Sequence, residues 1–167
     1  TTSNSAIQII SSLNNQLNIG LNTVSGNYGS YIQASDNNLA VSYPLNLQPN
    51  GGNVGVGGTP STWSTLTGLQ VKNASLAGFG NSLYLTQNTF YDGTAWKYIA
   101  NDFASKIQAD QGMTFSVASS GTAPNAITWI DALTISSGGD ATFSGNVNAT
   151  NASSPVNIIA TGINSGT

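Results

Sequence analysis

The chain has 167 residues, of which 39% are hydrophobic and only 5% are charged, and its net charge is −3. With three basic residues it has no basic stripe to neutralise phosphates, which argues against nucleic-acid binding. No apolar run approaches the roughly 20 residues of a membrane-spanning helix, so no membrane insertion is expected. The absence of Cys excludes disulfides and thiolate metal sites.

Short runs of strand-forming residues, separated by Asn, Gly and Ser, follow one another along the chain. In the first part, strands are expected at Ala6–Ile10, Gln16–Leu21, Tyr28–Ala34, Leu39–Val41 and Leu45–Leu47. In the second part, they are expected at Leu69–Val71, Ser82–Thr86, Lys97–Ala100, Ser105–Ala109, Thr114–Ala118, Ala126–Ile130, Leu133–Ile135 and Ala141–Phe143. Turn pairs such as Asp92-Gly93 separate these runs. Many short strands with regular turns predict an all-β sandwich or prism.

Three short blocks recur in the same order with steadily growing offsets. They pair Ile7–Ile9 with Leu69–Val71, Ser30–Ala34 with Ser105–Ala109, and Leu45–Leu47 with Leu133–Ile135. Collinear matches of this kind are typical of a duplicated module with insertions in the second copy. The chain is therefore expected to pass from module to module, and the copies are expected to gain stability by stacking.

The expected domains follow from this repeat. Residues 1–60 form a first β module, incomplete at its N-terminus. Residues 61–148 form a second β module with two insertions, at about 85–100 and 118–131, and residues 149–167 begin a third module or a linker.

Two segments resemble phage tail-fibre and related virion appendage proteins. Residues 45–57 (LNLQPNGGNVGVG) resemble an LNL…GGNVGIGT element of these proteins, from which Val56 and residues 58–60 depart mildly. Residues 132–147 (ALTISSGGDATFSGNV) resemble a second version of the same element, and residues 91–122 also resemble segments of such proteins. The resemblance implies tandem small antiparallel β-sandwich or β-prism modules, stacked along a fibre axis as an intertwined homotrimer.

An aromatic cluster in the first insertion is the strongest candidate site. Residues 90–98 (FYDGTAWKY) predict a hairpin with aromatic residues on both arms, and Tyr91, Trp96 and Tyr98 are the candidate ligand-binding residues. Exposed aromatic faces suit the C–H patches of sugar rings. The competing interpretation, which the sequence favours, is packing across the strands or between subunits.

No catalytic residues, metal site or cofactor are predicted. The common catalytic bases His, Cys and Glu are missing, and no pair of Asp residues has obvious spacing for glycoside hydrolysis. Residues 36–38 and 101–102 offer oxygen ligands, but turns explain them better. We therefore expect a non-enzyme.

The leading hypothesis is a structural segment of a trimeric viral tail fibre or virion appendage that supports host attachment. Its expected partners are copies of itself, other fibre, tail or capsid proteins, and a cell-surface glycan, and its expected location is the virion or the extracellular space. The first alternative is a carbohydrate-binding adhesin or receptor-binding module that uses the aromatic insertion. The second alternative is a glycan depolymerase.

Overall fold

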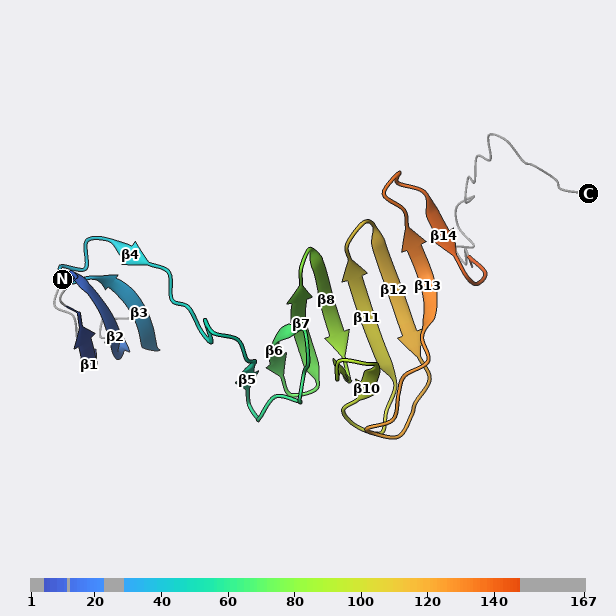
Figure 1. Cartoon of the computed structure of the whole chain (residues 1–167), viewed down its shortest axis with the longest axis horizontal. Helices are drawn as coiled ribbons and strands as arrows, with labels where there is room; N and C mark the ends of the chain where they lie inside the picture. The colour runs from blue at the N-terminus through green and yellow to red at the C-terminus, as the bar shows by residue number, and fades with distance from the viewer. Residues whose placement is uncertain (1–4, 12, 23–28, 148–167) are drawn as a thin grey trace, which may run out of the picture. The chain divides into compact units, whose positions relative to one another are not determined.

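The computed structural model describes residues 5–11, 13–22 and 29–147, and these residues form an all-β structure without helices (Figure 1). The predicted all-β class with antiparallel sheets is therefore confirmed. None of the described segments is a helix long and apolar enough to cross a membrane. The expected third module at residues 149–167 lies outside the described residues.

The chain divides into two compact units, Thr1–Asn50 and Gly51–Thr167. The division falls after Asn50 rather than after residue 60, because the short strand β5 (Val54–Val56) pairs in parallel with β6 (Thr67–Val71) and so belongs to the second sheet. Each unit is described separately below.

The first unit is a four-stranded antiparallel sheet in the order β1-β2-β3-β4 (Figure 1). Its strands are β1 (Ser5–Ile10), β2 (Asn15–Asn22), β3 (Gly29–Asp36) and β4 (Ser42–Tyr43). The expected strand at Leu39–Val41 is wrong, because the Asp36 carboxylate accepts hydrogen bonds from the N–H groups of Ala40 (2.7 Å) and Val41 (3.0 Å) and holds a turn there. Leu45–Leu47 also lies outside the sheet.

The second unit contains an eight-stranded sheet in the order β14-β13-β12-β11-β8-β7-β6-β5 and a separate two-stranded ribbon. Besides β5 and β6, the sheet contains β7 (Ala74–Phe79), β8 (Ser82–Gln87), β11 (Ala104–Ala109), β12 (Met113–Ala118), β13 (Ile130–Ile135) and β14 (Ala141–Phe143). The ribbon consists of β9 (Thr89–Tyr91) and β10 (Trp96–Tyr98). The expected strand at Ala126–Ile130 is wrong, since only Ala126 forms an isolated bridge, to Lys97, and β13 begins at Ile130.

The recurring sequence blocks do not occupy equivalent places in the two sheets. One strand, β2, separates β1 from β3, whereas β7 and β8 both lie between β6 and β11. Because neighbouring strands here are antiparallel, β3 runs in the same direction as β1, but β11 runs opposite to β6. The third block forms strand β13 in the second unit and no strand in the first. The recurrence therefore reflects a shared strand pattern rather than a shared topology.

The two faces of the eight-stranded sheet differ in chemistry because side chains alternate along each strand. One face, here called the covered face, carries a row of aligned residues across seven strands: Gly55, Gln70, Ser75, Thr86, Lys106, Ser116 and Asp131. The other face, here called the open face, is apolar. Its middle row is apolar in all eight strands: Val54, Leu69, Leu76, Leu85, Ile107, Phe115, Leu133 and Phe143.

The covered face lies beneath side chains of the chain's own loops and ribbon. A small core of Tyr98, Ala104 and Ala118 forms there, with Ile127 and Trp129 packed against it. Trp63 is also buried, and its indole N–H donates a hydrogen bond to Oε1 of Gln70 (2.9 Å). The hydrophobic core of this unit is thus confined to one side of its sheet.

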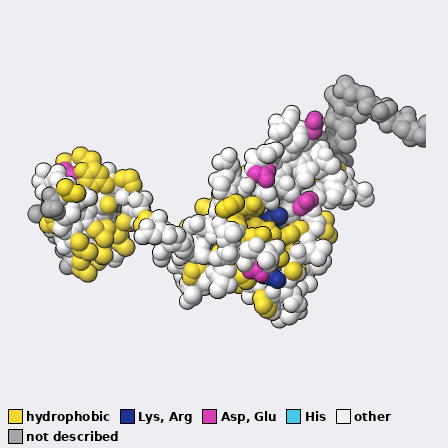
Figure 2. All heavy atoms as spheres, viewed as in Figure 1, with side chains coloured by type: hydrophobic (Ala, Val, Ile, Leu, Met, Phe, Trp, Pro, Cys, Tyr) yellow, Lys and Arg dark blue, Asp and Glu magenta, His cyan; other side chains and the backbone are white. Residues whose placement is uncertain are grey.

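In the first unit, too, polar side chains are buried on one face of the sheet and apolar side chains are exposed on the other. Gln8, Gln16, Asn18 and Ser35 form a network of side-chain hydrogen bonds on one face of its sheet, and Asn18 and Ser35 are fully buried. Hydrophobic side chains cover much of the visible surface of this unit (Figure 2). Its opposite face aligns Ile7 with Ile19 and Ile32, and Ile9 with Leu17, Ala34 and Tyr43.

Candidate aromatic binding site

The ribbon β9–β10 presents the predicted aromatic residues, and a tight turn fixes its shape. Oδ1 of Asp92 accepts hydrogen bonds from the N–H of Ala95 (2.8 Å) and from the N–H (2.9 Å) and hydroxyl (2.7 Å) of Thr94. These bonds, led by that from Ala95 and assisted by Lys97 at 3.6 Å, hold the pKa of Asp92 well below its usual range. The predicted Asp92-Gly93 turn is confirmed, with Gly93 at a φ of 99°. The turn places Tyr91 directly opposite Trp96.

Trp96 is the centre of an aromatic cluster. Its ring centroid lies 5.2 Å from that of Tyr84, 5.5 Å from that of Tyr91 and 6.0 Å from that of Trp63. The Trp63 pair is nearly perpendicular at 87°, which is a favourable edge-to-face geometry. These contacts fix the orientation of the Trp96 ring, so the site is preformed.

A cavity of about 300 Å³ opens beside this cluster and is here called the aromatic pocket. It is lined by Thr65, Leu66, Phe79, Tyr84, Tyr91 and Trp96. The volume is at the lower end of the range for ligand pockets. Tyr84, Tyr91 and Trp96 are all partly exposed, so their rings are accessible to a solute.

Tyr98, the third predicted site residue, does not line this pocket. It is 6% exposed, and its hydroxyl donates a hydrogen bond to the backbone carbonyl of Ser119 (2.7 Å). Its ring packs so closely against Gly121 that a Cβ at that position would overlap it. Tyr98 therefore anchors residues 119–121 to the ribbon, which is a structural role.

Lys106 lies on the covered face within reach of two indole rings. Its Nζ is 5.7 Å from the centroid of Trp96 and 5.1 Å from that of Trp129. Burial lowers the pKa of Lys106, and the carboxylates of Asp131 and Asp110 oppose that shift. This cation supports the Trp96 ring from the side of the sheet.

Sequence reasoning missed four residues of the pocket: Thr65, Leu66, Phe79 and Tyr84. Tyr84 alternates with Leu83 and Leu85, and this alternation alone places it on the opposite face from both leucines. The pattern does not reveal which face the ribbon covers, so the neighbourhood of Tyr84 and Trp96 was not predictable from it.

The Asp carboxylates mainly accept hydrogen bonds that stabilise local turns. Asp36 and Asp92 each accept two backbone hydrogen bonds within their own loops. Within residues 5–11, 13–22 and 29–147, no group of three or more His, Cys, Asp or Glu side chains is placed to hold a metal ion. Asp131 instead accepts a hydrogen bond from the Ser116 hydroxyl (2.7 Å).

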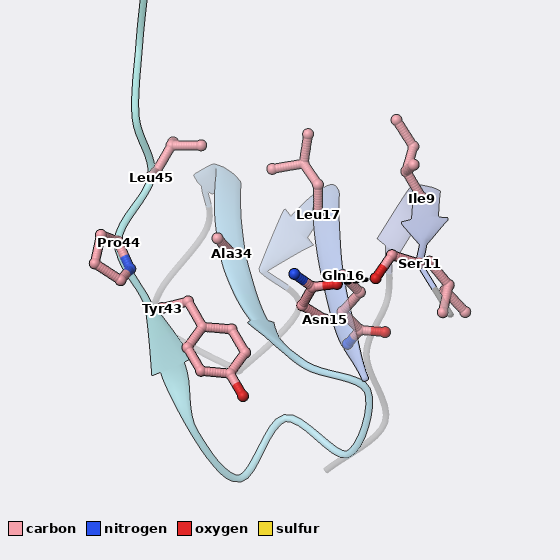
Figure 3. Close-up of a pocket in the computed structure, with 10 residues that line it drawn as sticks. Ile9, Ser11, Asn15, Gln16, Leu17, Ala34, Tyr43, Pro44 and Leu45 are labelled. Atoms are coloured by element: carbon pink, nitrogen blue, oxygen red, sulfur yellow. Dashed lines mark hydrogen bonds between the residues drawn. The ribbon is translucent and has the colours of Figure 1, made fainter. Parts of the chain in front are cut away.

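A second hollow, of about 390 Å³, lies on the apolar face of the first unit (Figure 3). Leu17, Ala34 and Tyr43 lie along one aligned row there, and the small side chain of Ala34 leaves the space between the larger two. Pro44 and Leu45 extend its wall beyond β4. This hollow belongs to an exposed apolar surface rather than to an enclosed ligand site.

Comparisons with protein-family models, curated proteins and solved structures find no match to this chain.

Proposed function

We propose that this chain is a structural, self-associating segment of a homotrimeric virion appendage of the phage tail-fibre type, which supports host attachment at the virion surface. The resemblance of residues 45–57 and 132–147 to tail-fibre elements supports this proposal from the sequence. The distribution of polar and apolar side chains supports it from the structure.

The observation that carries the proposal is that both units bury polar side chains and expose apolar ones. Asn18 and Ser35 are 0% exposed and Ser116 is 2% exposed, whereas Ile9 is 60% exposed and Leu85 is 53% exposed. A soluble monomer rarely leaves large apolar patches in water, and such patches mark sites of interaction. An arrangement of this kind is expected in a chain whose folded state includes other copies.

The free energy gained by burying these exposed side chains is large enough to drive association. Ten large apolar side chains on the open face of the eight-stranded sheet are about half exposed: Val56, Leu69, Val71, Leu76, Leu83, Leu85, Met113, Val117, Ile130 and Phe143. Fully burying such a side chain is worth roughly 1.5–3 kcal/mol, so covering these half-exposed ones yields roughly 7–15 kcal/mol. This is comparable to the roughly 4–15 kcal/mol that association costs in lost freedom.

The low charge content agrees with the same proposal. Charged residues make up 5% of the chain, against about 25% in typical soluble domains. Charged residues are depleted at the core of protein interfaces. A chain that buries much of its surface against copies of itself needs few charges.

Sedimentation analysis of the purified chain tests the proposal. We expect a particle with three times the 17.1 kDa of one chain, stable on dilution through the micromolar range. Negative-stain electron microscopy of the same sample should show elongated particles. A well-folded monomer over this concentration range would contradict the proposal.

The aromatic pocket favours a second candidate function, binding of a carbohydrate. Tyr84, Tyr91 and Trp96 offer partly exposed rings around a cavity of about 300 Å³, and aromatic faces suit sugar rings. On a glycan array, Trp96→Ala should abolish any signal of the parent chain. Tyr98→Phe should keep it, because that change removes only the hydrogen bond to Ser119. An array without signal for the parent chain would exclude this candidate for the glycans displayed.

A further inference from the structure

The open face of the eight-stranded sheet is an extended, mostly apolar surface, in which Thr67, Gln87 and Ser105 are the polar residues. Its middle row runs from Val54 to Phe143 and is flanked by two further rows in register. One flanking row comprises Val56, Val71, Ala74, Gln87, Ser105, Val117 and Ile130, and the other comprises Thr67, Gly78, Leu83, Ala109, Met113, Ile135 and Ala141. None of the residues in the three rows carries a charge. All the Lys and Asp residues of the sheet's strands, namely Lys106 and Asp131, point to the covered face.

The dimensions of this face match those of a stable interface. Each residue of a sheet occupies about 4.8 Å across the strands and, on one face, about 7 Å along them, so the 22 residues of the three rows cover about 740 Å² in projection. Stable interfaces bury about 800 Å² on each partner, whereas the largest apolar patch of a typical monomer is about 300–600 Å². The open face therefore has the size of an interface rather than of an incidental patch.

The open face is not flat but contains a hollow. A hollow of about 410 Å³ lies where Ala74, Ser105 and Ala132 supply small side chains among Leu85, Phe115 and Val117. The first unit has a similar hollow at Ala34. Large side chains of an opposing surface would fill such hollows, as side chains interdigitate between packed sheets.

We propose that the open face packs against the open faces of other copies of this chain around a symmetry axis. The inference rests on the self-association in the proposed function and assigns the surface that mediates it. Because the three rows are uncharged, two such faces meet without repulsion between like charges. The absence of Lys on the face offers nothing to an anionic membrane or to an acidic partner, which favours another copy as the occupant.

A pair of single substitutions in the full chain tests this assignment. Leu85→Lys places a cation at the centre of the open face. The matched control is Phe79→Lys, because Phe79 lies on the opposite side of the same β7–β8 hairpin and is 62% exposed. We expect Leu85→Lys to lower the association constant in sedimentation equilibrium at least tenfold, and Phe79→Lys to leave it unchanged. Circular dichroism establishes that each variant is folded.

A second measurement does not depend on Leu85→Lys being folded. Since the chain has no Cys, Leu85→Cys and Phe79→Cys each provide a single thiol. In the oligomer, we expect maleimide to react at least tenfold more slowly at position 85 than at position 79. On dilution to the monomer, the two rates should converge.

The outcomes separate this inference from the proposed function. If the parent chain is oligomeric but both Lys variants remain so and the position-85 thiol reacts freely, the open face is not the interface, and the proposed function stands. If the parent chain is monomeric, both fail. If the parent chain is monomeric and floats with phosphatidylcholine vesicles, and Leu85→Lys abolishes this flotation, the open face binds a lipid surface and the inference is overturned.

Discussion

The side chain of Asn88 holds both backbone groups of Ala100: its Oδ1 accepts a hydrogen bond from the Ala100 N–H (2.7 Å), and its Nδ2 donates one to the Ala100 carbonyl (3.1 Å). The same Nδ2 also donates to the carbonyl of Phe103 (2.9 Å). Asn88 is fully buried, and it lies where the chain leaves the sheet for the ribbon β9–β10. The Asn88 side chain thus joins the beginning and the end of the segment between β8 and β11, which contains the ribbon β9–β10 and its aromatic residues Tyr91 and Trp96.

Replacing Asn88 should destabilise the second unit strongly. Asn88→Ala removes three hydrogen bonds from a buried site, so we expect a loss of about 2–4 kcal/mol in the free energy of unfolding, measured by urea denaturation. Asn88 has a φ of 57°, which is unfavourable for Ala. Asn88→Gly removes the same bonds without that strain and should lose about 1 kcal/mol less. Equal losses for the two variants would contradict the role of backbone strain.

The close contact between Gly121 and Tyr98 gives a second prediction. Because a Cβ at Gly121 would overlap the Tyr98 ring, Gly121→Ala should destabilise the unit by about 1–3 kcal/mol. In a Tyr98→Leu background the same change should cost much less, since the six-membered ring is gone. Additive losses in this double-mutant cycle, followed by urea denaturation, would show that the two sites act independently.

Gln70 gives a third prediction, at the base of the aromatic cluster. Its Oε1 accepts hydrogen bonds from the Trp63 indole N–H (2.9 Å) and the Ser61 N–H (2.8 Å), and its Nε2 donates to the Lys72 carbonyl (2.7 Å). Gln70→Leu leaves these groups without this partner, and we expect a loss of about 2–3 kcal/mol with an altered Trp fluorescence spectrum. Gln111→Leu, at an exposed position in the turn between β11 and β12, is the matched control and should have little effect.

The Asp92 turn gives a prediction about pH. The folded-state pKa of Asp92 is depressed, so its contribution to stability is fully present above the ordinary value of 3.8 and is lost as the pH falls below it. Between pH 5 and pH 3, the urea midpoint of the parent chain should therefore fall more than that of Asp92→Asn, whose amide oxygen still accepts hydrogen bonds at both pH values. Parallel curves for the two proteins would disprove the contribution of Asp92.

Local chemistry made part of the structure predictable. Strand-forming runs such as Thr114–Ala118 and the Asp92-Gly93 pair determine backbone conformation over a few residues, and both predictions are confirmed. The pairing of aromatic residues across the hairpin was predictable for the same reason, because Tyr91 and Trp96 are close in the sequence and flank one turn. The site could be predicted as far as Tyr91 and Trp96, which face each other across one turn.

The remaining features were not predictable because they depend on contacts between segments that are far apart in the sequence. Alternation in β8 separates Tyr84 from Leu83 and Leu85, but it does not show that the polar side of this sheet is covered and the apolar side is open. Tyr98 and Trp96 share one side of β10, yet Tyr98 alone reaches the core, because Ala104, Ala118 and Gly121 leave room for its ring. Matching blocks in the sequence likewise carried no information on the direction of β11.

The outermost strands of the eight-stranded sheet, β5 and β14, have only three residues each. A long exposed edge strand offers its unpaired backbone groups to further chains and promotes amyloid-like growth, and very short edge strands reduce that hazard. This chain combines two such edges with a broad apolar face. Its geometry therefore disfavours indefinite addition of strands side by side, so that a surface otherwise prone to aggregation is directed towards closed particles of defined size.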